Sequence, residues 1–148
     1  MNMTPAEYRR THRKELAAKA IKYYRDNREE IIARKRRKPQ LSWARYTICS
    51  HKKSGYQVHF TPLSLEKLAL NAITCPICDV RLAWKTSGQN EGAKFNSPSL
   101  DRKNNDRILT LNKVWIICYR CNGTKLDRSL AEFIAYCERV VNTFKGEL

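Results

Sequence analysis

Apolar residues at helical spacing form only a thin stripe in the first 40 residues of the chain. A helix is expected from Thr4, where Pro5 suits the first turn and Glu7 completes a capping box. Helix-compatible sequence continues to Lys38, with a break expected near Asp26. The stripe consists of Leu16, Ala17, Ala20, Ile21, Tyr24, Ile31 and Ile32. Because these residues can bury little surface, packing alone is not expected to hold this segment in place.

The pattern in the middle of the chain predicts a helix, a strand and a second helix. Residues 41–53 are expected to form a helix with Trp43, Tyr46 and Thr47 along one side, ending at Gly55. Residues 56–60 alternate as a short strand would. A further helix starts at Thr61 and is expected to direct apolar side chains inward, namely Leu65, Leu68, Ala69, Ala72 and Ile73.

Strands and turns dominate the pattern after residue 74. Strands are expected at 80–84, at 99–101 and within 109–118, with a loop over 86–97 and a charged turn over 102–107. A short helix is expected to start at Asn122, and a capping box of Ser129 and Glu132 opens the last helix. The apolar face of that helix is interpreted as core: Leu130, Phe133, Ile134, Cys137, Val140, Val141 and Phe144. These elements together predict an α+β fold.

The charge of the chain indicates a polyanionic partner. Lys and Arg outnumber Asp and Glu by 29 to 14, which gives a net charge of +15. Residues 1–40 hold thirteen of the basic residues against five acids. The densest run is Arg34, Lys35, Arg36, Arg37 and Lys38. We interpret this segment as an arm that contacts nucleic acid phosphates, the alternative being a solvated, partly frayed helix.

A membrane is the less favoured partner for these charges. The basic segments lack a Trp, Phe or Leu face that could insert into an anionic surface. No apolar run approaches the roughly 18 residues of a membrane span. No membrane partner is therefore expected.

Two Cys-x-x-Cys pairs predict one structural zinc site. Cys75 with Cys78, and Cys118 with Cys121, have the spacing that lets two thiolates reach one tetrahedral ion. Two disulfides or a redox motif are the alternatives. No apolar signal-peptide core follows Met1, so a cytoplasmic location with reduced thiols is expected, which favours metal. Cys137 is interpreted as core, and Cys49 has no assigned role.

The chain is expected to have four parts. Residues 1–40 form the basic helical arm, and residues 41–74 form a helix-strand-helix lead-in. Residues 75–128 form the zinc-braced core, and the helix in 129–148 packs on that core. In this division the zinc is a brace, and the segment between the cysteine pairs holds the working site.

Three motifs within this core carry a resemblance to a known family. They are the Cys75–Cys78 pair, the segment 97–102 (Ser-Pro-Ser-Leu-Asp-Arg), and the segment 118–125 (Cys-Tyr-Arg-Cys-Asn-Gly-Thr-Lys). With its order of strand, acidic turn, strand and helix, the chain resembles phage-type HNH (His-Me finger) endonucleases with an endonuclease VII-like layout. The resemblance implies a zinc-braced ββα-metal finger with flanking helices. It also implies double-stranded or branched DNA as partner and the host cell cytoplasm as location, and it is compatible with a homodimer.

The resemblance also implies roles for particular residues. Asp101 and Asn122 would be the ligands of a catalytic Mg²⁺ or Mn²⁺ ion. Lys125 would lie near the scissile phosphate or the start of the helix. Asn112 is nearest to the central asparagine of the family, although Lys113 stands at the position that the spacing gives.

The main departure from the family is Arg102, which stands where the family has its general-base histidine. A guanidinium stays protonated at neutral pH, so Arg102 can hold a phosphate but cannot act as a base. His59 is the candidate base from outside the motif, although a lone strand histidine is more often a surface residue. Without a side-chain base, the metal would have to lower the pKa of its bound water further.

Two functions from different classes follow from these motifs. The first is a metal-dependent DNA endonuclease that hydrolyses phosphodiester bonds. The second is a zinc-braced DNA-binding protein that has lost this chemistry. A weaker third function is an RNA-binding zinc ribbon of ribosomal type.

Overall fold

The computed structural model describes residues 3–84 and 92–146 of the chain. The chain divides into two units, Met1–Arg37 and Lys38–Leu148. The loop expected over 86–97 falls partly outside the described residues, and its described part, 92–97, contains no helix or strand before Pro98. No helix in the described part of the chain is long and apolar enough to cross a membrane.

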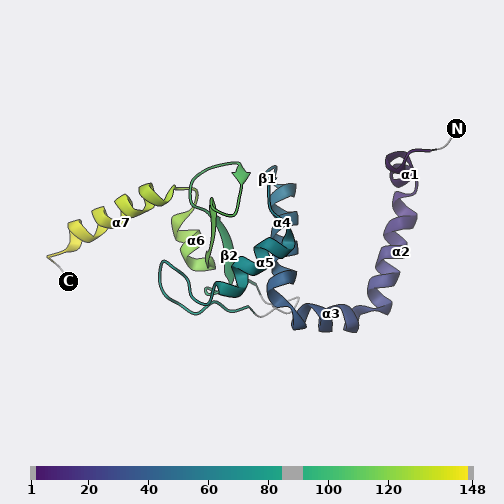
Figure 1. Ribbon diagram of the computed structural model, residues 1–148, viewed down its shortest axis with the longest axis horizontal. Helices are drawn as coiled ribbons and strands as arrows, with labels where there is room; N and C mark the ends of the chain where they lie inside the picture. The colour runs from purple at the N-terminus through teal and green to yellow at the C-terminus, as the bar shows by residue number, and fades with distance from the viewer. Residues whose placement is uncertain (1–2, 85–91, 147–148) are drawn as a thin grey trace. The chain divides into compact units, whose positions relative to one another are not determined.

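The first unit consists of three helices, α1 (Pro5–Thr11), α2 (Arg13–Asp26) and α3 (Arg28–Arg37) (Figure 1). The predicted capping box at Thr4 and Glu7 is present, and the predicted break follows Asp26. A second break, at His12, was not expected. None of the three helices has a buried residue. The thin apolar stripe is therefore not buried, as its small size predicts, although Ile31 and Ile32 are half-buried.

The second unit begins with two helices that pack side by side, α4 (Pro39–Lys53) and α5 (Pro62–Asn71) (Figure 1). The buried face of α4 consists of Leu41, Ala44, Thr47 and Ile48. Tyr46, which we expected on that face, is exposed. Thr61 caps α5 as predicted, but the helix ends before Ile73, which is exposed rather than inward-facing.

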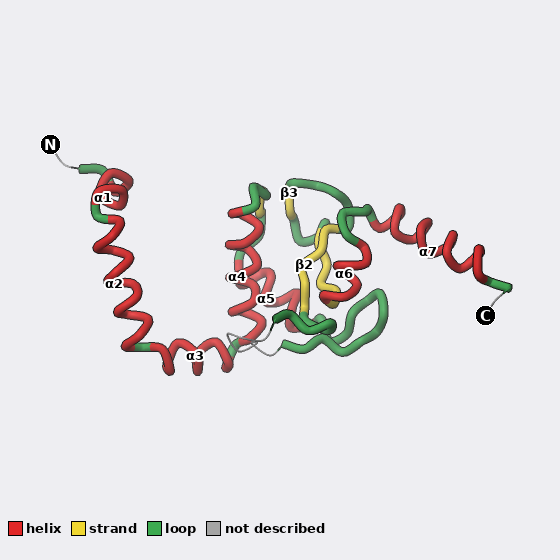
Figure 2. The backbone as a smooth tube through the Cα atoms, turned by 180° about the vertical axis from the view of Figure 1, so that it is seen from behind, coloured by secondary structure: helices red, strands yellow, loops and turns green. Residues whose placement is uncertain are grey.

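The strands form two short sheets, drawn in yellow in Figure 2. β2 (Pro98–Arg102) pairs antiparallel with β4 (Val114–Cys118), with Asp101 opposite Trp115. β1 (Gln57–Val58) pairs parallel with β3 (Ile108–Leu109). The strand predicted at 56–60 is thus shorter than expected. The strand predicted at 80–84 is wrong, because only one isolated bridge, between Thr74 and Arg81, forms there.

The helix α6 (Tyr119–Lys125) follows β4 directly and contacts both β2 and β4. It starts three residues before the expected position, because Cys118 caps it through its sulfur. It ends at Lys125, and the φ of 55° and ψ of −134° at the next residue, Leu126, are those of a type II′ turn position that favours glycine. The fully buried side chains of the second unit include Leu109, Ile117, Cys75 and Cys118.

The last helix, α7 (Leu130–Phe144), begins at the predicted capping box of Ser129 and Glu132. Its first residue is anchored, since the Leu130 N–H donates to the Lys103 carbonyl at 2.8 Å. Phe133 is buried, but the rest of the apolar face is not. The interpretation of this face as core is therefore right for Phe133 but wrong for the exposed residues Ile134, Cys137, Val140, Val141 and Phe144. The periodicity reports an amphipathic helix correctly but does not specify what the apolar face packs against.

Candidate metal centre and the adjoining ion pair

The four cysteines of the two Cys-x-x-Cys pairs meet in one cluster. The Sγ atoms of Cys75, Cys78, Cys118 and Cys121 all lie within 4.8 Å of one another. The Cys78 and Cys118 sulfurs are 3.7 Å apart. Zn–S bonds of about 2.3 Å in a tetrahedron separate sulfur atoms by about 3.8 Å, so the cluster can hold a metal ion such as Zn²⁺. All four cysteines are free thiols, which excludes the disulfide alternative here.

Tight backbone turns place each cysteine pair. After α5, the Cys75 N–H donates to the Val80 carbonyl and the Cys75 carbonyl accepts from the Asp79 N–H, both at 2.9 Å. Asp79 has a φ of 55°, a left-handed conformation that aspartate tolerates better than most residues. In the second pair, the Cys118 sulfur accepts the Cys121 N–H at 3.3 Å. A thiolate at this position is also favoured by the dipole at the start of α6.

The protonation of the thiols differs across the cluster. A backbone hydrogen bond from Val80 is the main cause that lowers the pKa of Cys78 to about 7. Burial raises the pKa of Cys118 and that of Cys121. Since only thiolates ligate zinc, an ion that binds here must displace the protons of the buried thiols.

Asp101 lies in a buried ion pair rather than at an open site. Its side chain is 5% exposed, and that of Lys125 is 1% exposed. The Lys125 Nζ is 3.2 Å from Oδ2 and 3.3 Å from Oδ1 of Asp101. Trp115 donates its Nε1–H to Oδ2 at 2.6 Å, and the Lys125 ammonium also donates to the Arg102 carbonyl at 2.9 Å. Both buried charges therefore have hydrogen-bonding partners.

This pair constrains what Asp101 can bind. Lys125 was expected near a scissile phosphate or the helix start; it is not at the helix start but in the last turn of α6, where it is buried. A divalent ion at Asp101 would meet the Lys125 ammonium at close range and would have to displace it. The carboxylate is thus neutralised by the protein itself.

Asn122 is held by a different partner on the same strand. Its Nδ2 donates to the Ser99 hydroxyl at 2.8 Å. Ser99 and Asp101 lie on one face of β2, because side chains two residues apart in a strand point the same way. Ser99–Asn122 and Asp101–Lys125 therefore form two adjacent links between β2 and α6. No hydrogen bond joins Asp101 to Asn122 among the described residues.

The other predicted site residues lie apart from this strand–helix contact. The Arg102 side chain is on the opposite face of β2 from Asp101, with its Cζ 5.0 Å from the centre of the Tyr56 ring. His59 is exposed, and no hydrogen bond or ion pair of its ring occurs in the described part of the chain. Asn112 stabilises the turn between β3 and β4, where its carbonyl accepts from the Lys103 Nζ at 2.9 Å. The structure does not bring these three residues together with Asp101.

The basic run Arg34, Lys35, Arg36, Arg37 and Lys38 covers the end of α3 and the residue before α4, and all five residues are exposed.

Sequence reasoning missed the roles of Trp115 and Tyr56. The place of Trp115 opposite Asp101 depends on strand register. Tyr56 meets Arg102 through a contact between residues far apart in the chain. Neither is visible in a local pattern.

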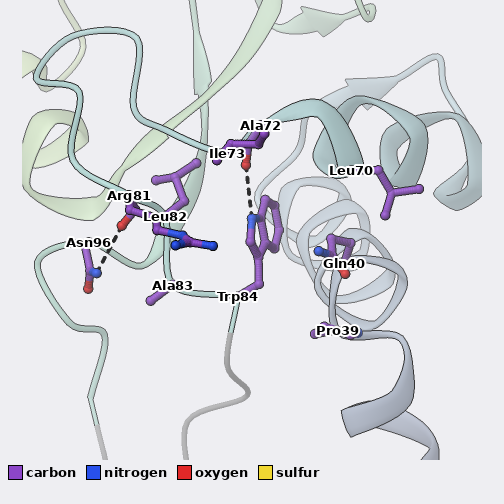
Figure 3. Close-up of a pocket in the computed structure, with 10 residues that line it drawn as sticks. All are labelled: Pro39, Gln40, Leu70, Ala72, Ile73, Arg81, Leu82, Ala83, Trp84 and Asn96. Carbon is purple, nitrogen blue, oxygen red and sulfur yellow. Dashed lines mark hydrogen bonds between the residues drawn. The ribbon is translucent and has the colours of Figure 1, made fainter.

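An open pocket lies at the start of α4 and the end of α5 and has a volume of about 560 Å³ (Figure 3). The indole of Trp84 spans it and donates to the Ala72 carbonyl at 3.1 Å, and Asn96 donates to the Arg81 carbonyl at the same distance. The described residues that line it include no acid, histidine or cysteine. None of the predicted catalytic residues lies in this pocket.

Comparison with known proteins gives no family for this chain: no protein-family model, no curated protein and no solved structure matches it. The assignment of function therefore depends on the site itself.

The cysteine cluster predicts that one zinc ion supports folding. Structural zinc contributes on the order of 10 kcal/mol or more in small domains, so Cys118→Ser should lose the ion and unfold the second unit. Zinc content by mass spectrometry and circular dichroism would measure both. Cys49→Ser, at an exposed cysteine outside the cluster, is the matched control and should change neither. A folded Cys118→Ser protein with undiminished zinc would contradict the assignment.

The buried ion pair predicts strong coupling between Asp101 and Lys125. Asp101→Asn and Lys125→Met should each lower the free energy of unfolding by about 3–5 kcal/mol, because each leaves one charge buried without its partner. The double variant should lose much less than the sum of the two. Urea unfolding at constant zinc concentration would measure this.

The exposed pair of Lys113 and Asp106 is the matched control. Its N–O distance is also 3.2 Å, but both side chains are about 40% exposed. Asp106→Asn and Lys113→Met should therefore each cost less than about 1 kcal/mol. Equal losses at the two pairs would show that burial does not set the coupling.

Proposed function

We propose that this protein binds DNA through a metal-braced ββα unit made of β2, β4 and α6, with the basic arm supplying additional phosphate contacts. The proposal is supported by the connection of the three elements, in which β4, paired with β2, leads directly into α6. Cys118 and Cys121 lie at that junction and cluster with Cys75 and Cys78. This is the order that the resemblance to ββα-metal fingers implies.

The observation that carries the proposal is the exposed charge of the arm. Helices α1 to α3 contain no buried residue, so packing does not account for the charged sequence of the arm. Thirteen basic residues against five acids in the first 40 positions repel one another unless a polyanion is bound. Phosphates along a DNA backbone would neutralise these charges and release counterions.

A second candidate function is metal-dependent hydrolysis of DNA. It is favoured by the two adjacent links between β2 and α6, because they put Asp101 and Asn122 at neighbouring places in one contact. In this alternative a Mg²⁺ or Mn²⁺ ion would replace the Lys125 ammonium beside Asp101. Its water would then need activation by the metal, since Arg102 cannot act as a base.

We place binding before hydrolysis for a physical reason. A nuclease of this type needs a carboxylate that is open to a divalent ion. Asp101 instead has both oxygens engaged by Lys125 and Trp115 and is almost fully buried. Replacing a paired ammonium by a dehydrated divalent ion would cost the desolvation of that ion and would leave Lys125 without its partner.

The test combines binding and cleavage on the same preparation. Fluorescence anisotropy with a labelled DNA duplex should show binding without added divalent ion, and a supercoiled plasmid should stay intact in Mg²⁺ or Mn²⁺. If the plasmid is cut, hydrolysis becomes the function, and Asn122→Ala should then reduce the rate by at least about a hundredfold. Absence of DNA binding would refute the proposal, and preference for an RNA of equal length would favour the ribosomal-type alternative.

The arm is expected to bind DNA without sequence preference. If Arg36 and Arg37 each contact one phosphate, changing both to Gln should weaken binding to all duplexes alike. The slope of log K against log salt should fall by about 0.9 for each lost contact. Lys52→Gln with Lys53→Gln, at the end of α4, removes the same charge and serves as the control. A slope that changes no more in the arm variant than in the control would mean that the arm does not contact phosphate.

A further inference from the structure

Two guanidinium groups meet at one aromatic ring in the second unit. The Arg102 Cζ is 5.0 Å and the Arg107 Cζ is 5.9 Å from the centre of the Tyr56 ring. Arg102 comes from the end of β2, and Arg107 from the residue just before β3. Cations within about 6 Å of a ring centre are attracted by its negative face. Tyr56 therefore fixes the place of both cations.

The backbone holds all three residues in position. The Tyr56 N–H donates to the His51 carbonyl at 3.1 Å, and the next N–H, of Gln57, donates to the Arg107 carbonyl at 3.0 Å. The Arg102 carbonyl accepts from the buried Lys125 ammonium. The His51 ring also packs against Tyr56, with 5.6 Å between ring centres. The fold therefore fixes the backbone at all three residues, and from these positions both arginine side chains reach the ring.

Neither arginine has a carboxylate partner among the described residues. Asp106, next to Arg107, pairs with Lys113 at 3.2 Å. Asp101, next to Arg102, pairs with Lys125. Each adjacent acid is thus engaged by a different cation, and two like charges share one ring without a counter-ion. Two cations that share one ring repel each other, and an anion bound between them would offset that repulsion.

We propose that Arg102, Arg107 and Tyr56 form a clamp for one phosphate group of a nucleic acid backbone. The proposal rests on the proposed DNA binding and gives it a specific contact in the second unit, apart from the arm. The two guanidinium groups donate N–H bonds to the phosphate oxygens, and the ring of Tyr56 positions them. Planar guanidinium forks match phosphate oxygens in pairs, which a lysine cannot do.

Charge and burial favour a phosphate over a stacked base. The guanidinium groups already lie against the Tyr56 ring, so the ring is not free to act as a stacking platform. Arg102 is half-buried and Arg107 is exposed, which gives one fixed donor group and one that faces solvent. The Asp101 carboxylate lies on the other face of β2 and is neutralised by Lys125, so it does not repel an anion bound here.

The test compares single variants that each remove one arginine charge. Arg107→Gln and Arg102→Gln should each weaken binding of a labelled 20-base-pair duplex by about tenfold, and the double variant, which loses the one phosphate contact, should reduce the salt slope by about 0.9. Arg128→Gln is the matched control, because Arg128 also lies over a tyrosine, Tyr136, at 4.9 Å. It should change the affinity by less than about twofold. Zinc content and circular dichroism would show that each variant is folded.

The ring has its own test. Tyr56→Phe keeps the aromatic face and should bind DNA as the unchanged protein does, whereas Tyr56→Leu should weaken binding as much as loss of one arginine. Equal binding by the Leu and Phe variants would overturn the role of the ring.

The outcomes separate the clamp from the proposed function. If the unchanged protein binds DNA and both arginine variants behave as Arg128→Gln does, the clamp is overturned and DNA binding stands. If the unchanged protein binds no DNA, the proposed function fails, and inorganic phosphate is then titrated while the Nε–H signals of Arg102 and Arg107 are followed by NMR. Saturable shifts of both signals would support an anion site there. Unshifted signals would overturn the clamp.

Discussion

The four-cysteine cluster is the constraint on which the second unit depends. Its ligands come from two places in the chain, the turn after α5 and the junction of β4 with α6. The sheets are small, with strands of two and five residues, so they bury little surface by themselves. Bringing the two places together seats α6 against β2. The buried Asp101–Lys125 pair and the Ser99–Asn122 hydrogen bond follow from that contact.

The alternation of side chains along β2 separates two kinds of chemistry. Asp101 points toward α6, where the protein supplies its own cation, and Arg102 points toward Tyr56, where it meets a second cation. In a sequence motif the two residues are neighbours and suggest one site. In the fold they belong to different faces. The acid and the arginine therefore do not form one site.

How much of this could be predicted depends on the range of the interactions. Capping boxes at Thr4 and Ser129 and the spacing of the cysteine pairs are local features, and the structure confirms the helix starts and the cluster. The pairing of Asp101 with Lys125 depends on how α6 packs on β2, which no short segment specifies. The prediction that the apolar face of α7 is core failed for a related reason. Amphipathic spacing indicates which side of a helix is apolar but not whether the rest of the chain covers it.

The ion pair also has a consequence for how this sequence can change over time. A neutral residue at position 101 leaves a buried ammonium without its partner, and a neutral residue at position 125 does the same to a buried carboxylate. Each single step therefore passes through a less stable protein, although an apolar pair at both positions can be as stable as the charged one. The two positions are therefore expected to change together. If descendants of the chain keep this aspartate and this lysine, the loss of stability on replacing either one alone is enough to explain it. Such conservation would not require a role of either residue in function.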